Sequence, residues 1–136
     1  MGVEFVDTNV LIYANDRGAG RKYEKAGALL IRLAEARDGA LSTQVLAEFY
    51  SAVTRKLAMK SEEAEAVIAN LGVWAIHRPS HESVLSACRL QRRYGIAWWD
   101  ALLVESAIEM EASVLWSEDL NHGQRYGSVT VRNPFR

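Results

Sequence analysis

Hydrophobic residues form two patterns along the chain, a spacing of three or four positions and short continuous runs. These patterns predict helices and strands in alternation. Apolar residues return every three or four positions between Arg21 and Arg37, and Gly39 follows where a helix C-cap glycine would stand. Val3–Val6 is instead a short, largely apolar run that ends at Asp7, as a buried strand would. We expect helices over residues 8–15, 21–37, 43–57, 61–71, 80–95 and 98–111. We expect strands over residues 3–6, 40–42, 73–77, 113–116 and 129–131.

Strands that are separated by helices pair in parallel through right-handed crossovers. The alternation therefore predicts an α/β fold with a parallel sheet between helices. The chain has 136 residues, two prolines and no segment with the composition of a linker or a repeat. We expect a single domain over residues 1–136.

Composition narrows the class of protein. Hydrophobic residues make up 49% of the chain and charged residues 24%, which excludes a disordered or collagen-like chain. Cys88 is the only cysteine, which excludes a disulfide framework and fits a reducing compartment. No apolar run approaches the roughly 20 residues that span a membrane, and the first residues lack a signal-peptide pattern. We therefore expect a cytoplasmic protein with no membrane association.

The net charge of -1 limits any role with nucleic acid, because a protein that held nucleic acid by charge alone would be more basic. Such a role requires a local basic patch, a metal ion or a partner. Two groups of basic residues are candidates: Arg17, Arg21, Lys22 and Lys25, and then Arg89, Arg92 and Arg93. A solvated helix start explains the first group equally well, and positive charge that suits a helix C-terminus explains the second.

Three aspartates stand where parallel sheets bind ligands. Asp7 ends the first predicted strand, Asp100 lies at the start of a predicted helix, and Asp119 follows a predicted strand. Open parallel sheets bind ligands at the carboxyl ends of their strands, so these three side chains are expected to face one crevice. Each also has a structural explanation, since aspartate caps helices, favours helix N-termini and occurs in turns.

Glu48 is a fourth candidate acid. It belongs to a stripe of polar residues on the predicted helix 43–57, formed by Gln44, Glu48, Ser51 and Arg55. The stripe either lines the crevice or is a solvated helix face, and periodicity does not separate the two.

Four carboxylates that converge require a cation, because like charges raise one another's pKa. Oxygen ligands suit Mg²⁺ or Mn²⁺ rather than zinc. Such a site activates water and stabilises charge on a phosphoryl group, which is metal-assisted hydrolysis of a phosphodiester. Whether one ion or two would bind stays open.

Four segments, spread between Val3 and Val131, resemble the PIN-domain family. They are Asp7-Thr8-Asn9-Val10-Leu11, Ala47-Glu48-Phe49, Trp99-Asp100-Ala101-Leu102-Leu103-Val104 and Ser117-Glu118-Asp119-Leu120. More narrowly, the chain is similar to VapC-type ribonuclease toxins of type II toxin–antitoxin pairs. The resemblance implies an α/β/α sandwich with a central, mainly parallel sheet and an acidic site for Mg²⁺ or Mn²⁺.

The resemblance also implies roles for the acids. Residues that match Asp7 and Asp100 are the usual metal ligands of the family. Those that match Glu48 and Asp119 complete the catalytic cluster, directly or through water on the metal. Asp119 is preferred to its neighbour Glu118 because it matches the family's position.

Polar neighbours are expected to support these acids. By the same resemblance, Asn9 donates an orienting hydrogen bond within the cluster, and Thr8 and Ser117 are hydroxyls that hydrogen-bond the acids. The implied reaction is hydrolysis of RNA by a metal-activated water, which leaves a 5′-phosphate and a 3′-hydroxyl. The implied partners are an RNA substrate, a cognate antitoxin and a second copy in a homodimer.

Other side chains carry weaker expectations. Arg17, Arg21 and Lys22 are candidate RNA contacts, and Trp98 and Trp99 are expected to pack in the core or an interface rather than stack on a base. Two rival functions stay open, a small Mg²⁺-dependent phosphatase of haloacid-dehalogenase type and a non-catalytic binding module. The phosphatase is disfavoured because its Asp-x-Asp motif would have Asn9 in place of the second aspartate.

Overall fold

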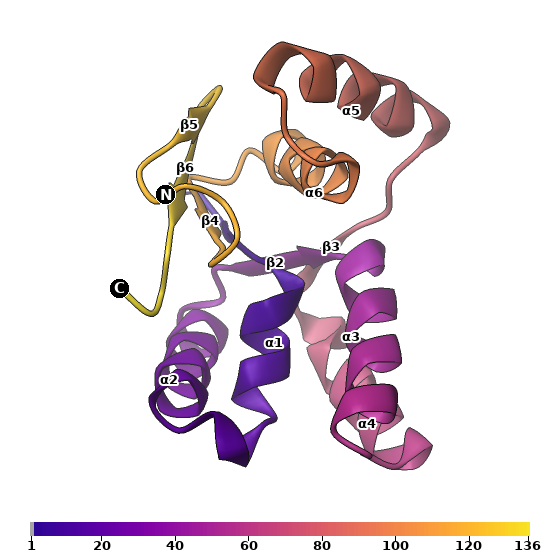
Figure 1. Ribbon diagram of the computed structural model, residues 1–136, viewed down its shortest axis with the longest axis vertical. Coiled ribbons are helices and arrows are strands. Elements are labelled where there is room, and N and C mark those ends of the chain that lie inside the picture. Colours follow the sequence, from indigo (N-terminus) through magenta and orange to yellow (C-terminus); the bar gives the residue numbers. More distant parts are fainter. Residues whose placement is uncertain (1) are drawn as a thin grey trace.

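The computed structural model describes residues 2–136 and shows a six-stranded sheet with helices on both faces (Figure 1). The strands are β1 (Glu4–Val6), β2 (Gly39–Ser42), β3 (Ala75–His77), β4 (Val114–Trp116), β5 (Arg125–Tyr126) and β6 (Val129–Arg132). The helices are α1 (Thr8–Ala14), α2 (Arg21–Ala36), α3 (Thr43–Lys56), α4 (Ser61–Asn70), α5 (His81–Tyr94) and α6 (Trp98–Glu109). Two 3₁₀ turns, η1 (Arg17–Ala19) and η2 (Leu71–Val73), complete the elements. The expected α/β fold with a mainly parallel central sheet is confirmed.

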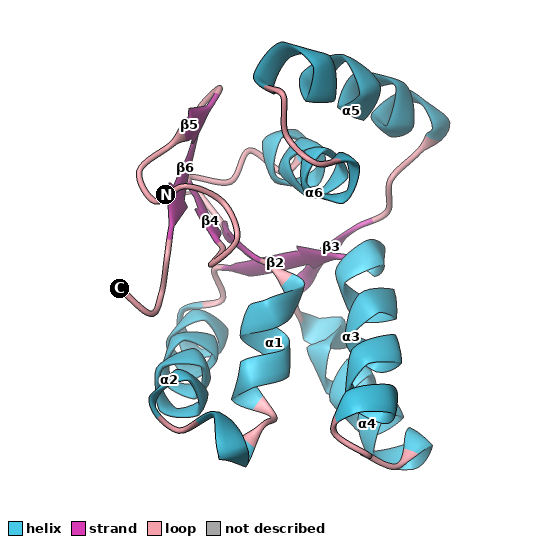
Figure 2. Ribbon diagram, in the orientation of Figure 1, coloured by secondary structure: helices cyan, strands magenta, loops and turns pink. Residues whose placement is uncertain are grey.

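The strand order is β3-β2-β1-β4-β6-β5, and every neighbouring pair is parallel except β5 and β6. Helices α1 to α4 lie on one side of the sheet, and α5 and α6 lie on the other (Figure 2). The chain runs outward from β1 in one direction to β2 and β3 and in the other to β4 and β6. The point between β1 and β4 is therefore the topological switch point, where α/β sheets open a crevice at their strand ends.

Side-chain caps explain where several helices begin. Ser42 Oγ accepts a hydrogen bond from Val45 N at 3.3 Å, which starts α3 directly after β2. Ser80 starts α5 with a reciprocal capping box that involves Ser83. The helix ends at Gly95, whose φ of 64° is the left-handed conformation that glycine adopts without strain.

The core lies on both faces of the central strands. Phe5, Leu41 and Leu115 are fully buried on the strands, and Phe49 is fully buried on α3. Residues 101–107 of α6 are buried all round because this helix lies between the sheet and α5 (Figure 2). None of the helices among residues 2–136 is long and apolar enough to cross a membrane.

The structure corrects three details. The expected strand 73–77 begins only at Ala75, because η2 extends the preceding helix by one tight turn. Strand β5 was not predicted, since two residues are too few to show a period. Gly39 does not cap α2: Arg37 takes the left-handed C-cap position with φ 59°, and Gly39 is the first residue of β2.

Gly39 is required for close packing. A Cβ at this position would lie 2.5 Å from Cε3 and Cζ3 of Trp74. We expect Gly39→Ala to lower the free energy of unfolding by about 1–3 kcal/mol, the usual cost of overpacking, measured by urea denaturation. The matched control is Gly27→Ala, because a Cβ at Gly27 meets no heavy atom within 4 Å and alanine favours the helix. Equal stability of the Gly39→Ala and wild-type proteins would contradict this packing role.

Candidate functional site

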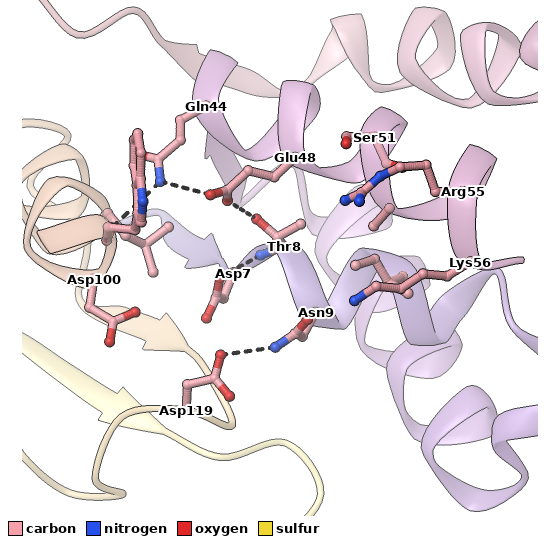
Figure 3. A pocket seen from close by; sticks show the side chains of 14 residues that line it. Asp7, Thr8, Asn9, Gln44, Glu48, Ser51, Arg55, Lys56, Asp100 and Asp119 are labelled. Atoms are coloured by element: carbon pink, nitrogen blue, oxygen red, sulfur yellow. Dashed lines mark hydrogen bonds between the residues drawn. The ribbon is translucent and has the colours of Figure 1, made fainter. Parts of the chain in front are cut away.

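A cleft of about 350 Å³ opens where β1 and β4 end, at the topological switch point. Residues from α1, α3 and α6 and from the loop after β4 line it. The cleft brings together all four acids predicted from the sequence, Asp7, Glu48, Asp100 and Asp119 (Figure 3). Their convergence follows from topology, because parallel strands present their carboxyl ends at the same edge of the sheet.

Asp7 is the most deeply buried of the four acids. Its Oδ1 accepts a hydrogen bond from Thr8 N at 2.6 Å, and its Oδ2 accepts one from Ser117 Oγ at 2.8 Å. The pKa of Asp7 is raised from 3.8 to about 7, mainly by burial and also by the charges of Asp119 and Asp100, against the effect of these hydrogen bonds. Asp7 also caps α1, so one residue both caps the helix and lines the cleft.

Glu48 is tied to α1 and α6 by neutral partners. Thr8 Oγ1 donates to Glu48 Oε1 at 2.7 Å, and Gln44 Nε2 lies 3.4 Å from Glu48 Oε2 and 3.5 Å from the Trp99 carbonyl oxygen. All four members of the polar stripe on α3 line the cleft. The stripe is therefore a wall of the cleft. The Thr8 hydroxyl contacts Glu48, whereas the Thr8 backbone N–H contacts Asp7.

Ser117 and Asn9 hold the loop after β4. Ser117 is buried, and its Oγ accepts from Asp119 N at 3.2 Å while it donates to Asp7. Asn9 Nδ2 donates to Asp119 Oδ2 at 2.9 Å (Figure 3). These two contacts direct the Asp119 carboxylate toward the cleft, beside Asp7.

Glu118 points to a different cluster. Tyr13 Oη donates to Glu118 Oε1 at 2.9 Å, and Lys22 Nζ forms an ion pair with Glu118 Oε2. Lys22 Nζ also lies 4.9 Å from the centre of the Tyr13 ring. Asp119 therefore faces the cleft, whereas Glu118 anchors the loop to α1 and α2.

The basic residues expected to contact RNA are not part of the cleft wall. Lys22 is paired with Glu118, and neither Arg17 nor Arg21 lines the cleft. The sequence grouped these three residues because they are close along the chain. It could not show that Lys22 pairs with a carboxylate 96 positions away.

Asp100 shows that the carboxylates influence one another. It lies in the first turn of α6, and burial raises its pKa, with further contributions from the charges of Asp119 and Glu48. A divalent cation would relieve this repulsion, and four carboxylates form the oxygen donor set that Mg²⁺ or Mn²⁺ prefers. Within residues 2–136, no three His, Cys, Asp or Glu side chains are already arranged so that they could hold a metal ion. The four side chains thus have the chemistry that such a cation prefers, but their carboxylates are not close enough together in this structure to hold it.

Comparison with known proteins decides the family. The model of the PIN-domain family matches residues 5–127, which include all four acids. The chain belongs to the PIN-domain family. No protein with a curated description matches the sequence.

Solved structures share the fold of this PIN domain at low sequence identity. VapC20 of Mycobacterium tuberculosis, a sarcin-ricin loop cleaving toxin, has a TM-score of 0.68 at 19% identity, covering 85% of this chain and 91% of that chain. VapBC2 from Rickettsia felis, bound to a DNA fragment from its promoter, has a TM-score of 0.68 at 23% identity, covering 96% and 98%. A toxin–antitoxin complex from Klebsiella pneumoniae has a TM-score of 0.69 at 20% identity, covering 96% and 97%.

Two basic residues and one tryptophan are among the residues that line the cleft of this PIN domain. Arg55 and Lys56 come from the last turn of α3, and Trp99 comes from the first turn of α6. Arg55 had a signal in the sequence, since it belongs to the polar stripe, but it was not assigned a contact. Trp99 is expected to pack in the core or in an interface; it is 61% exposed, so it is not a core residue, and packing in an interface stays a prediction.

Proposed function

We propose that this PIN domain is a metal-dependent endoribonuclease that acts as the toxin of a VapC-type toxin–antitoxin pair. The observation that carries the proposal is the convergence of four carboxylates in one cleft of a PIN-domain chain. Further support comes from a protein of the same fold, VapC20, which is a sarcin-ricin loop cleaving toxin. RNA in the cytoplasm is the substrate class that we infer.

In this proposal Asp7 and Asp100 hold a Mg²⁺ or Mn²⁺ ion, and Glu48 and Asp119 complete the site. When bound, the cation supplies an activated water and neutralises charge that develops on the phosphoryl group. The protein's own part is to hold the carboxylates in position. Burial makes Asp7 costly to ionise without a cation, so this residue favours occupancy of the site.

The neutral partners orient the acids. The Ser117 hydroxyl donates to Asp7, the Asn9 amide donates to Asp119, and the Thr8 hydroxyl donates to Glu48. A donor fixed on each of these three carboxylates limits its rotation, which is how residues behind a metal site tune it.

A cognate antitoxin and a second copy of the chain are the proposed protein partners. Structures of the same fold include VapBC2 and the Klebsiella toxin–antitoxin complex, in which the toxin occurs with its antitoxin. A small protein encoded beside this chain should co-purify with it. Light scattering of the chain, with and without that protein, measures whether it forms a homodimer.

The decisive experiment is cleavage of total RNA by the purified chain in Mg²⁺, in Mn²⁺ and in EDTA. Discrete fragments that require the cation, with 5′-phosphate ends, are the expected result. Fragments that persist in EDTA would overturn the proposed chemistry. Folded protein that is free of antitoxin and leaves RNA intact would favour the non-catalytic binding module. Release of phosphate from small phosphomonoesters, with RNA left intact, would favour the phosphatase.

Asp119 and Glu118 are adjacent carboxylates with different surroundings, and their substitution separates their roles. We expect Asp119→Asn to slow RNA cleavage by about 10–100-fold, the usual loss when a group that supports a metal site is removed. Glu118→Gln keeps an oxygen for Lys22 and Tyr13, so its cleavage rate should stay within about twofold of the wild-type rate. Rates measured side by side on one RNA pool check this difference, and a larger loss in Glu118→Gln would reverse the assignment.

A further inference from the structure

Asp100 differs from the other three acids of the cleft in how it is held. Hydrogen-bond donors contact the side chains of Asp7, Glu48 and Asp119 directly. Within residues 2–136, no donor forms a hydrogen bond with the Asp100 carboxylate. The place of this carboxylate in the cleft is therefore set by the first turn of α6, to which Asp100 belongs.

The first turn of α6 has a single polar anchor on the rest of the fold. Ala97, the residue before the helix, has no side chain that could cap it. Among the residues that the structure describes, only the Gln44 side chain forms a hydrogen bond with residues 97–101, with Nε2 at 3.5 Å from the Trp99 carbonyl oxygen. A carbonyl oxygen has two lone pairs, so this contact coexists with the hydrogen bond inside the helix. Gln44 thus ties the turn that carries Asp100 to α3.

Gln44 contacts Glu48 with the same nitrogen atom. Its Nε2 lies 3.4 Å from Glu48 Oε2, one helical turn further along α3 (Figure 3). The amide nitrogen of glutamine carries two hydrogens, so it can donate to the carboxylate and to the Trp99 carbonyl at once. The reverse orientation of the amide would face its oxygen toward two other oxygens. One side chain therefore links the acid on α3 to the helix turn that carries the acid on α6.

The oxygen of the same amide has no partner. Gln44 Oε1 is buried without a hydrogen-bond donor, and within residues 2–136 it is the only buried side-chain oxygen or nitrogen in that state. A buried acceptor without a donor destabilises a fold. An apolar side chain at this position would avoid that penalty, so packing alone does not explain an amide here.

We propose that Gln44 is a positioning residue that sets the spacing of Glu48 and Asp100 across the cleft. This inference rests on the proposed function and adds to it a residue that acts through the acids. Both of its contacts are longer than the roughly 2.9 Å of a usual N–H···O hydrogen bond, so the amide limits the separation of α3 and α6 without holding them at their closest approach. Loss of the amide should release the first turn of α6 and weaken the binding of the cation proposed for this cleft.

The first test follows the backbone and needs no cation. Amide hydrogen exchange in EDTA, resolved by nuclear magnetic resonance, reports opening of the first turn of α6 at Ala101 N, which donates to the Ala97 carbonyl oxygen at 2.9 Å. Gln44→Met has a side chain of similar length without a donor, so exchange at Ala101 should become about five- to tenfold faster, the factor that corresponds to loss of one hydrogen bond. Gln44→Glu keeps the shape but faces an oxygen toward both acceptors, and it should exchange at least as fast as Gln44→Met.

The second test measures Mn²⁺ binding without RNA, from the electron paramagnetic resonance signal of free Mn²⁺. Gln44→Met should bind Mn²⁺ about tenfold more weakly, the lower end of the usual loss when a group behind a metal site is removed. Thr8→Val removes the other donor to Glu48 but no contact with α6, so it should weaken Mn²⁺ binding without faster exchange at Ala101. The matched control is Gln91→Met, because Gln91 lies on α5, is half-buried like Gln44 and is outside the cleft.

Three results would overturn the proposal. The first is wild-type exchange at Ala101 in both Gln44→Met and Gln44→Glu, or wild-type Mn²⁺ affinity in Gln44→Met. The second is lower stability of Gln44→Met in urea with exchange and Mn²⁺ affinity unchanged, which would assign the side chain to packing. The third is an equal loss in Gln91→Met, which would show a general effect of replacing a helical glutamine.

Failure of this inference differs from failure of the proposed function. Cation-dependent RNA cleavage at equal rates in the wild type and Gln44→Met, over a series of Mn²⁺ concentrations, would retain the nuclease and reject the positioning role. Faster exchange and weaker Mn²⁺ binding in Gln44→Met, without RNA cleavage by the wild type in any cation, would retain the positioning role and reject the nuclease. A wild-type protein that binds no Mn²⁺ would reject both.

Discussion

Asp7→Asn is expected to lower cation-dependent RNA cleavage at least about 100-fold and to make the cation-free protein more stable. Both effects come from removal of the Asp7 charge. The cation needs this charge, whereas burial and the neighbouring acids make it costly when no cation is bound. Asparagine keeps the shape of the side chain and an oxygen for Thr8 N, but it carries no charge for a cation. The loss of activity therefore comes with a gain in stability, as occurs when a functional group is held in an unfavourable environment.

The direction of the pH effect follows from the raised pKa. Because the pKa of Asp7 is about 7 in the folded protein and 3.8 ordinarily, the unfolded chain ionises first as pH rises. Asp7 then destabilises the cation-free fold increasingly between about pH 4 and pH 7, and by a constant amount above pH 7. A difference of about three pKa units corresponds to about 4 kcal/mol, and the altered contact with Ser117 offsets part of it. We expect Asp7→Asn to gain about 1–3 kcal/mol at pH 8 and nothing at pH 4.

Urea denaturation in EDTA at pH 4, 6 and 8 checks the stability, and RNA cleavage in Mn²⁺ checks the activity. Glu105 also has its pKa raised, to about 7, so the variant must be compared with wild type at each pH. Asp38→Asn is the matched control, because Asp38 lies outside the cleft and makes no side-chain hydrogen bond within residues 2–136. If Asp7 were only a helix cap, asparagine would replace it in that role, and RNA cleavage would not change.

Mn²⁺ or Mg²⁺ is expected to raise the melting temperature of the wild-type protein by about 10 °C at a hundredfold excess over the dissociation constant. Binding to the folded state alone contributes about 2.7 kcal/mol at that excess, and for a domain of this size each kcal/mol corresponds to about 4 °C. The shift should shrink at pH 5.5, where protons compete for Asp7. Thermal denaturation followed by circular dichroism measures it.

Two controls separate ion binding from general screening. Sodium chloride at the same ionic strength should leave the melting temperature almost unchanged, and Asp100→Asn should remove most of the shift caused by Mn²⁺. An equal shift in wild type and Asp100→Asn would show that the cation acts elsewhere and would remove the basis for a metal site in the cleft.

Periodic elements were well predicted from the sequence, and isolated contacts were not. The helices α2, α3 and α5 follow the spacing of apolar residues and the caps Ser42 and Ser80. Strand β5 and the role of Gly39 could not be predicted, because one is a short antiparallel pair and the other depends on a contact with Trp74. Such features arise from tertiary packing, which produces no periodic pattern in the sequence.

The same distinction applies to the candidate site. The convergence of Asp7, Asp100 and Asp119 was predictable, because the rule about strand ends depends only on the order of elements. The choice between Asp119 and Glu118 rested on family resemblance, and the structure supports it through contacts of side chains far apart in sequence. The exposure of Trp99 had no sequence signal, since an aromatic residue at a helix start is compatible with core or surface.

The cleft joins segments that are far apart in the sequence. Ser117 donates to Asp7 and Asn9 donates to Asp119, and each contact spans 110 positions. A chain still emerging from the ribosome has made Asp7 long before it has made residues 114–119, so its first acids stand without the strand and loop that complete the cleft. Residues 114–119 must therefore be synthesised before the four acids can lie together in one cleft, so the cleft forms late relative to Asp7.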